Sequence, residues 1–188
     1  MNKPKIHVIM GSIRNGRSGE KVTKWFMDAV KDQDVAELKL VDLKDYPLPL
    51  FADATPPSVR EGIHPLPEAQ KWLDVIDEAD GYIFITAEYN HSVPGAFKNA
   101  IDYGFKEWND KSIGFVGYGN PAGGSRAVEH LRQIASELRM HDIREQVVIP
   151  TVWEAFDQQD NLVNSESLAK TANLILQKVA KLAIQLKS

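Results

Sequence analysis

The sequence predicts an α/β fold built on a doubly wound, five-stranded parallel sheet with helices on both faces. Two observations predict it. Short apolar runs alternate with segments of helical periodicity along the chain, and the length of 188 residues suits a single domain, expected to span 1–188. Apolar strands that alternate with helices indicate a parallel sheet whose two faces are both covered.

Five segments have the character of strands: 6–10, 35–43, 82–86, 112–116 and 146–149. The smallest common arrangement for five such strands is the flavodoxin-like order 2-1-3-4-5, with right-handed crossovers. Ligands of these sheets bind outside the carboxyl ends of the strands. We therefore expect the site in the loops that follow the first, third and fourth strands.

Helices are expected between the strands. Apolar residues recur at helical spacing over 19–31, around 72–76, after Pro94, over 127–138 and over 165–186. In the last of these, apolar residues alternate at spacings of four and three from Leu168 to Leu186. That seam predicts a helix that covers the sheet.

The composition restricts the chemistry. Hydrophobic residues make up 43% and charged residues 26%, as in ordinary globular proteins, and there is no cysteine. Thiolate nucleophiles, iron–sulfur clusters and cysteine-bound zinc are thereby excluded, so redox chemistry requires a bound cofactor. A net charge of −4 gives no general attraction to nucleic acid or anionic lipid, and no apolar run approaches a membrane span. We expect a cytoplasmic protein that binds neither nucleic acid nor a membrane.

The first loop predicts an anion site. It runs from Gly11 to Gly19 and supplies the hydroxyls of Ser12 and Ser18 together with the guanidinium groups of Arg14 and Arg17. Glycines let the backbone approach a ligand, and the start of the following helix adds partial positive charge. These features together are typical of a phosphate site. A glycine-rich turn with solvated arginines is the simpler alternative.

Two common nucleotide motifs do not fit this loop. The dinucleotide fingerprint is absent, because Ile13 stands where its second glycine belongs. The P-loop pattern fails at Arg17, where a lysine is required, and no aspartate follows Thr86 to hold magnesium. Transfer of phosphate from a nucleoside triphosphate is therefore disfavoured.

The second and third loops carry a family resemblance. The segment from Ala87 to Asp102 reads AEYNHSVPGAFKNAID. It closely resembles the P-E-Y-N-x-S-x-P-G-x-[LF]-K-N-A-I-D signature of the NADPH-dependent FMN reductase family. The first loop resembles that family's G-S-x-R-x-G-R segment. The stretch from Tyr118 to Glu129 resembles its third loop, with Tyr-Gly, a Gly-Gly pair and R-A-x-E. The resemblance covers about residues 5–150.

The resemblance implies a function. It implies an NAD(P)H-dependent flavin oxidoreductase with non-covalent FMN, NADPH or NADH as co-substrate, and a quinone, azo compound, chromate or free flavin as acceptor. Cofactor-binding residues are expected at Ser12, Arg14, Arg17, Ser18, Ala87, Glu88, Tyr89, Asn90, Gly119, Gly123 and Gly124. No catalytic side chain and no metal ligand are assigned, and His91 is given no catalytic role. A non-enzymatic FMN-binding electron carrier or redox sensor is the alternative.

Several local features add expectations. Ala87 replaces the family's proline, which leaves a more flexible loop with an extra donor. Ser92 is expected to cap the helix that Pro94 opens. Gly123 and Gly124 stand before a helix, where glycine is entropically costly, which favours a ligand-driven reason for them.

Three further interpretations concern the surface. Arg126 and Glu129, three residues apart, are expected to form an exposed pair. Six of the ten prolines fall within 46–67, which predicts either a lid or a stiff connection. Phe105 and Trp108 lie in a region that makes dimer contacts in related flavoproteins, so a homodimer or homotetramer is expected.

Overall fold

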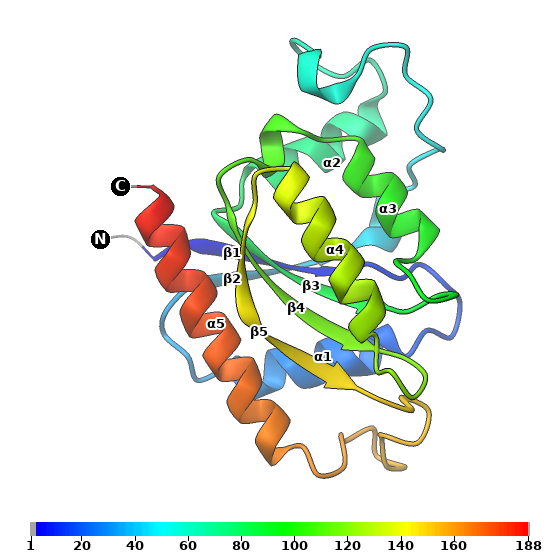
Figure 1. Cartoon of the computed structure of the whole chain (residues 1–188), viewed down its shortest axis with the longest axis vertical. Coiled ribbons are helices and arrows are strands. Elements are labelled where there is room, and N and C mark those ends of the chain that lie inside the picture. Colours follow the sequence, from blue (N-terminus) through cyan, green and yellow to red (C-terminus); the bar gives the residue numbers. More distant parts are fainter. Residues whose placement is uncertain (1–2, 188) are drawn as a thin grey trace.

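The computed structural model describes residues 3–187 and contains the five-stranded parallel sheet that the sequence predicts (Figure 1). Its order is β2-β1-β3-β4-β5, as expected. The strands are β1 (Lys5–Met10), β2 (Glu37–Asp42), β3 (Gly81–Ala87), β4 (Ser112–Tyr118) and β5 (His141–Ile149). Every residue of β3 and β4 is buried, because helices cover both faces of the sheet centre.

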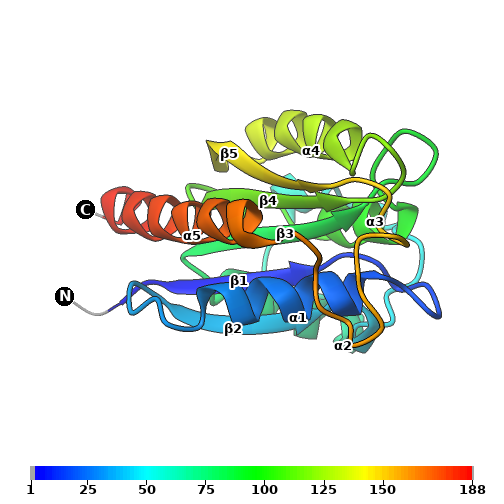
Figure 2. The ribbon, with the colours of Figure 1, turned by 90° about the horizontal axis from the view of Figure 1, so that it is seen from below.

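The helices form two layers. One face of the sheet carries α1 (Gly19–Val30) and α5 (Glu166–Leu186), which pack against each other (Figure 2). The other face carries α2 (Pro67–Asp77), α3 (Gly95–Asp102) and α4 (Ser125–Glu137). As its apolar seam predicts, α5 covers β3, β4 and β5. Among residues 3–187, no helix has both the length and the hydrophobicity needed to cross a bilayer.

The core under α2 and α3 is rich in aromatic rings. Trp108 is fully buried, packs edge-on against Tyr82 with ring centres 5.0 Å apart, and donates its indole N–H to the carbonyl of Ile101 at 3.1 Å. Phe105 is half-buried and packs against the same core. The Trp108 side chain is therefore used inside its own chain, and the homodimer or homotetramer expected from this region stays a prediction.

The fifth strand is longer than predicted. It begins at His141, not at residue 146, and its first residues are mostly exposed. A strand at the sheet edge can carry polar residues, and here the carboxylates of Asp142 and Glu145 pair with Arg132 and Lys178. Because this half of the strand is mostly polar, a pattern of apolar residues does not predict it.

The proline-rich segment (46–67) is fastened to α3. The amide of Asn99 accepts the N–H of Phe51 and donates to the carbonyl of Pro49, both at 2.8 Å. The Tyr103 hydroxyl donates to the same carbonyl at 3.1 Å. These bonds hold the start of the segment as a wall beside α3.

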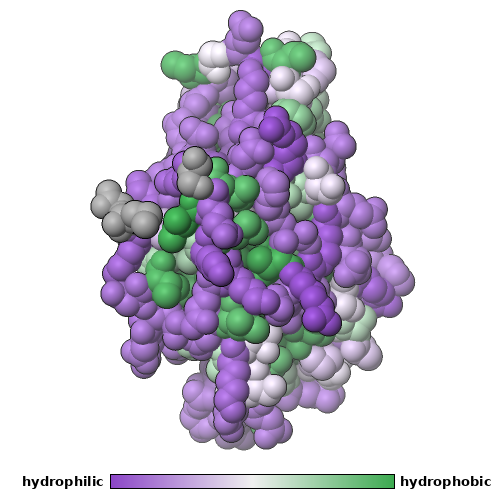
Figure 3. All heavy atoms as spheres, turned by 60° about the vertical axis from the view of Figure 1, so that its left-hand side comes forward, coloured by the Kyte–Doolittle hydropathy of each residue, from purple (hydrophilic) through white to green (hydrophobic). Residues whose placement is uncertain are grey.

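Exposed hydrophobic residues are few. On the face shown in Figure 3 one group of hydrophobic residues lies in a central patch among hydrophilic residues, and others lie at the top of the view. The most exposed large hydrophobic side chains are Leu50 and Ile63, both in the proline-rich segment.

Candidate functional site

Strand register brings the three predicted loops together at one edge of the sheet. The N–H of Gly11, just after β1, donates to the carbonyl of Ile85 in β3 at 3.0 Å. The N–H of Glu88, just after β3, donates to the carbonyl of Tyr118 at the end of β4 at 3.2 Å. The loops that follow β1, β3 and β4 are therefore neighbours in the order 1-3-4, as the fold requires.

The first loop presents unused donors. Ser18 stands at the N-cap of α1, but its side chain makes no capping hydrogen bond. The first amides of α1 therefore lack the partner that an N-cap hydroxyl normally supplies. Arg14 is exposed and has no hydrogen-bond or ion-pair partner among residues 3–187. A free cation beside an uncapped helix start is suited to an anion.

Arg17 lies on the inner side of the same loop. Its guanidinium forms a bidentate ion pair with Asp42 at the end of β2, donates to the carbonyl of Ser12, and reaches Glu20 at 3.2 Å. These bonds engage four of the five N–H groups of the side chain. The geometry gives Arg17 a bracing role in this loop, and its contact with a phosphate stays a prediction.

Two hydroxyls line the floor below the loop. Ser12 is fully buried, and its Oγ lies 2.9 Å from the Tyr89 hydroxyl, so the first and second loops are joined there. The buried Tyr118 hydroxyl makes no hydrogen bond of normal geometry. It lies where a side chain on Gly19 would stand, 2.6 Å from the ideal Cβ position. Burial raises the pKa of Tyr118 to about 12, so it keeps its proton.

Tyr118 was absent from the residues expected in the site. The sequence contains a signal for it, because a tyrosine that ends a central strand lies at the edge where ligands of such sheets bind. An unsatisfied buried donor beside a helix start points to a missing acceptor.

The second loop is a tight turn. Tyr89 and Ser92 exchange both backbone hydrogen bonds, at 3.0 and 3.1 Å, around Asn90 and His91. Asn90 and His91 both have positive φ, 48° and 73°, as two-residue turns of the primed type require. The turn projects both residues into solvent at the edge of the site.

Ser92 does not cap α3, contrary to expectation. The N-cap residue is Pro94, without a side-chain bond, and its carbonyl accepts the N–H groups of Phe97 and Lys98. The Ser92 hydroxyl instead lies 2.8 Å from Nδ1 of His130 in α4. That pair ties the turn to the neighbouring helix.

Glu88 has a different role from the rest of its loop. Its side chain is fully buried and pairs with Arg126, whose Nε donates to it at 2.6 Å and whose backbone N–H donates at 3.2 Å. The expected pair between Arg126 and Glu129 does not form, and Glu129 faces Arg132 at 3.7 Å. Glu88 therefore locks the second loop to the third, and only its backbone is free to border a ligand.

The glycine pair of the third loop is required by the protein itself. Gly124 has φ of +83°, and a Cβ there would overlap the backbone of Gly117 and Tyr118. Gly123 has φ of +59°, and its Cβ would overlap Val148 and the backbone at Pro150. Packing within the protein is therefore sufficient to explain this pair, and its contact with the cofactor stays a prediction. Gly119 differs, because a Cβ there would lie no closer than 3.6 Å to any neighbour outside its adjoining residues.

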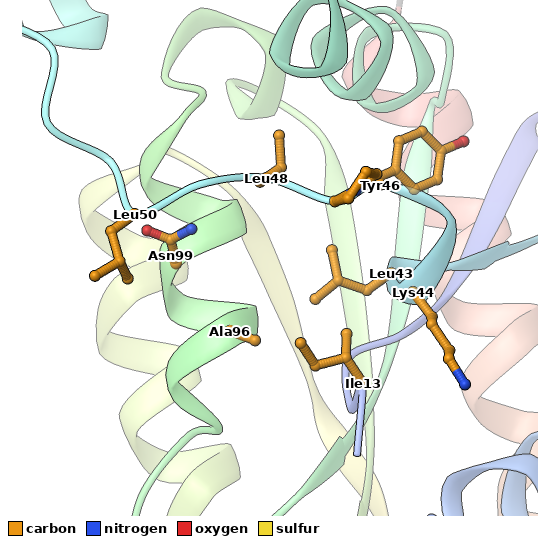
Figure 4. A pocket seen from close by; sticks show the side chains of 9 residues that line it. Ile13, Leu43, Lys44, Tyr46, Leu48, Leu50, Ala96 and Asn99 are labelled. Atoms are coloured by element: carbon orange, nitrogen blue, oxygen red, sulfur yellow. The ribbon is translucent and has the colours of Figure 1, made fainter. Parts of the chain in front are cut away.

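A cavity of about 400 Å³ opens beside the first loop (Figure 4). It lies between that loop, the segment after β2 and the start of α3. Its lining residues are Ile13, Leu43, Lys44, Tyr46, Pro47, Leu48, Leu50, Ala96 and Asn99. Residues 3–187 contain no cluster of three or more histidine, aspartate or glutamate side chains arranged for a metal ion.

These features fit FMN. The free Arg14, the uncapped start of α1 and the unpaired Tyr118 hydroxyl match the needs of a phosphate. The turn after β3 and the uncrowded Gly119 leave backbone groups available beside the phosphate site. The fold and the site together define a flavodoxin-like protein with donors for an anionic cofactor at the edge of its sheet.

Comparisons with known proteins agree with an FMN site. The family model described as NADPH-dependent FMN reductase matches residues 4–154. An NAD(P)H-dependent FMN reductase of Schizosaccharomyces pombe is 34% identical over 137 residues, which are 73% of this chain and 68% of that protein. An NAD(P)H:quinone oxidoreductase of Solanum tuberosum is 31% identical over 190 residues, covering 97% of this chain and 94% of its own.

The fold has solved counterparts. The flavoenzyme NAD(P)H:(acceptor) oxidoreductase FerB of Paracoccus denitrificans superposes with a TM-score of 0.71 at 18% identity, covering 98% of this chain and 97% of its own. The chain belongs to the NADPH-dependent FMN reductase family. It is an NAD(P)H-dependent flavin oxidoreductase with FMN as its cofactor, and the alternative of a non-enzymatic carrier finds no support.

Proposed function

We propose that this chain passes reducing equivalents from NAD(P)H, through FMN held by the three loops, to a small organic acceptor such as a quinone. The observation that carries the proposal is the group of unengaged donors around the first loop, formed by Arg14, Ser18 and Tyr118. Quinone is preferred because the relative from Solanum tuberosum, which this chain matches nearly end to end, is named an NAD(P)H:quinone oxidoreductase.

The protein's own residues supply binding and position. Arg14, Ser12, Ser18 and the first amides of α1 hold the phosphate, and Tyr118 donates its otherwise unpaired hydroxyl from below. The Arg17–Asp42 pair fixes the loop that carries these donors. At the ring end we propose the backbone of residues 87–90 and of Gly119 as the border of the flavin.

The site residues do not need to transfer protons. The carboxylate of Glu88 is buried and paired with Arg126, and the raised pKa of Tyr118 keeps that phenol neutral. When bound, FMN supplies the hydride and electron chemistry, while the protein orients it and excludes competing reactions. Other acceptors are azo compounds, chromate and free flavin. Which of them react is set by what can approach the exposed turn at Asn90 and His91.

One experiment tests this function. The purified protein is reconstituted with FMN, its visible spectrum is recorded, and NADPH or NADH oxidation is followed with and without a quinone. We expect flavin absorbance after reconstitution and acceptor-dependent oxidation of the nicotinamide. Failure to retain FMN would contradict the site, and retention of FMN without any oxidation of NADPH or NADH would contradict the reaction.

A further inference from the structure

The first loop contains the pair Asn15-Gly16, the one place in the sequence where glycine follows asparagine. Asparagine is chemically labile in this position, because the backbone nitrogen of the next residue can attack the side-chain amide. The reaction is fastest before glycine, since any other residue places a side chain beside the attacking nitrogen. The sequence therefore marks Asn15 as a position that can change without an enzyme.

The structure leaves both reacting groups free. Asn15 and Gly16 are exposed and lie in a turn outside any helix or strand. Neither the side-chain amide of Asn15 nor the backbone N–H of Gly16 makes a hydrogen bond with any residue of 3–187. The attacking nitrogen and the carbonyl carbon that it attacks can therefore approach each other without breaking a hydrogen bond.

The backbone around Gly16 is also open. Gly16 has φ of +65°, and nothing lies within 4 Å of the position that a Cβ would take there. A glycine in an exposed turn samples a wide range of backbone conformations. The turn can therefore reach the geometry in which the ring closes.

The pair Asp80-Gly81 shows how packing prevents the same reaction. Aspartate before glycine can form the same ring, but the Asp80 carboxylate accepts the backbone N–H of Lys5 at 2.8 Å. Gly81 is the buried first residue of β3 and pairs with Ile6 in β1. Of these two pairs in the sequence, the fold protects one and leaves Asn15-Gly16 exposed.

The charges around the turn favour the reaction. Ring closure begins when the nitrogen of Gly16 loses its proton, and a nearby cation stabilises the negative charge that develops there. The guanidinium of Arg14, next to Asn15 in the chain, has no partner among residues 3–187. The uncapped start of α1 adds partial positive charge. The positive field that suits this loop to a phosphate therefore also promotes attack on Asn15.

We propose that Asn15 is a site of spontaneous deamidation, and that the FMN-free protein loses affinity for FMN by this route. The nitrogen of Gly16 forms a bond to the side-chain carbonyl carbon of Asn15, and the side-chain nitrogen leaves as ammonia with the proton of Gly16. Water then opens the cyclic imide at either carbonyl, which yields aspartate or isoaspartate. The sequence of steps consumes water, releases ammonia and involves no oxidation or reduction.

The consequence rests on the proposed function, in which this loop holds the FMN phosphate. Each product places a carboxylate beside Arg14, so the phosphate meets a like charge and Arg14 gains a competing partner. Isoaspartate also lengthens the main chain by its β-carbon. Bound FMN slows the reaction, because its phosphate holds the loop in one conformation. Loss of FMN therefore exposes the protein to a change that hinders rebinding.

Peptide mass spectrometry tests the modification itself. The FMN-free and FMN-loaded proteins are incubated at mildly alkaline pH, and the peptides that contain Asn15 and Asn164 are compared over time. Asn164 is the internal control, because it is also exposed and without a partner among residues 3–187, but Ser165 follows it. We expect exchange of the amide for a carboxylate at Asn15, faster without FMN, while Asn164 stays intact. An Asn15 peptide that keeps its mass as long as the Asn164 peptide overturns the proposal.

FMN titration tests the effect on the cofactor. Asn15→Asp reproduces one product and should raise the FMN dissociation constant about tenfold, because a like charge stands near the phosphate. Gln133→Glu makes the same amide-to-carboxylate change at an exposed position of α4, on the opposite face of the sheet from α1, and should leave the constant unchanged.

Asn15→Gln blocks the reaction, because its longer side chain closes a ring far more slowly. Its FMN affinity should equal that of the parent at first and should persist after incubation without FMN, while the parent loses affinity. Equal losses in Asn15→Gln and the parent would assign the effect to another change and overturn the proposal.

These outcomes separate the inference from the function on which it rests. If the fresh parent neither binds FMN nor oxidises NADH, the proposed function fails, while the mass of the Asn15 peptide still decides on deamidation. If the fresh parent binds FMN and Asn15→Asp binds it equally well, the function stands and the proposed loss of affinity is overturned.

Discussion

The guanidinium of Arg17 and the carboxylate of Asp42 form a bidentate pair that joins the first loop to the end of β2, with 4% and 22% of their side chains exposed. Such a pair is geometrically specific, and breaking it by removing one partner leaves a charge with little water around it. The pair therefore holds the loop whose outer donors are proposed to bind phosphate.

This relationship predicts that Asp42→Asn and Arg17→Met act alike. Each should lower the free energy of unfolding by about 2 kcal/mol and weaken FMN binding, because each frees the same loop. Chemical unfolding and FMN titration measure the two effects. Lys24→Met, which breaks the exposed pair with Asp28, is the control and should cost less than about 0.5 kcal/mol. If Arg17→Met abolishes FMN binding while Asp42→Asn preserves it, Arg17 contacts the phosphate directly.

A second prediction concerns the hydroxyl of Tyr118. In Tyr118→Phe the buried donor without a partner is removed, so the FMN-free protein should gain about 1 kcal/mol of stability. FMN affinity should fall in the same variant, because the phosphate loses that donor. Thermal unfolding of the FMN-free protein and FMN titration test the two halves. A variant that is less stable without FMN, or that binds FMN as tightly as the parent, would show that the hydroxyl has another partner.

Three glycines in different surroundings give a graded prediction. Gly124→Ala forces a Cβ into the backbone of β4 and should cost about 3 kcal/mol or more, with or without FMN. Gly16→Ala has the strain of a positive φ but open space, and should cost about 1 kcal/mol. Gly95→Ala, at the start of α3 with no neighbour within 4 Å, should be neutral or slightly stabilising. An equal cost for all three in urea unfolding would contradict the packing explanation.

The fourth prediction is a pH dependence from His7 in β1. Burial, together with the charge of Lys39, lowers the pKa of His7 from 6.5 to about 4, against the opposing effect of Glu78. The unfolded chain therefore takes up a proton below about pH 6.5 that the folded protein refuses until about pH 4. Stability should fall as the pH drops through this window, by about 1.3 kcal/mol between pH 7.5 and 5.5.

His7→Leu isolates that contribution. The variant should lose about 1.3 kcal/mol less than the parent over the same interval, as measured by urea unfolding at each pH. Parallel losses in the two proteins would mean that His7 does not titrate in this window.

The sequence was sufficient for the strand order and for the edge where the loops meet, because apolar runs and turn glycines are local signals. It could not reveal what long-range packing decides. The partner of Arg17 is 25 residues away, and the partner of Glu88 is 38 residues away. Nothing local in the sequence shows that Trp108 packs against Tyr82 and bonds to Ile101. The sequence shows only that Gly124 precedes a helix, whereas the structure shows that the backbone of β4 leaves no room for a side chain there.

The first loop is proposed to bind the phosphate of FMN through its outer face, and Arg14→Ala removes the exposed cation of that face. Arg14 is exposed and has no partner within residues 3–187, so its removal should leave the stability of the FMN-free protein unchanged. We expect an FMN dissociation constant about tenfold higher than that of the parent, measured by fluorescence titration, because a charge-assisted contact is lost. An unchanged dissociation constant would contradict it.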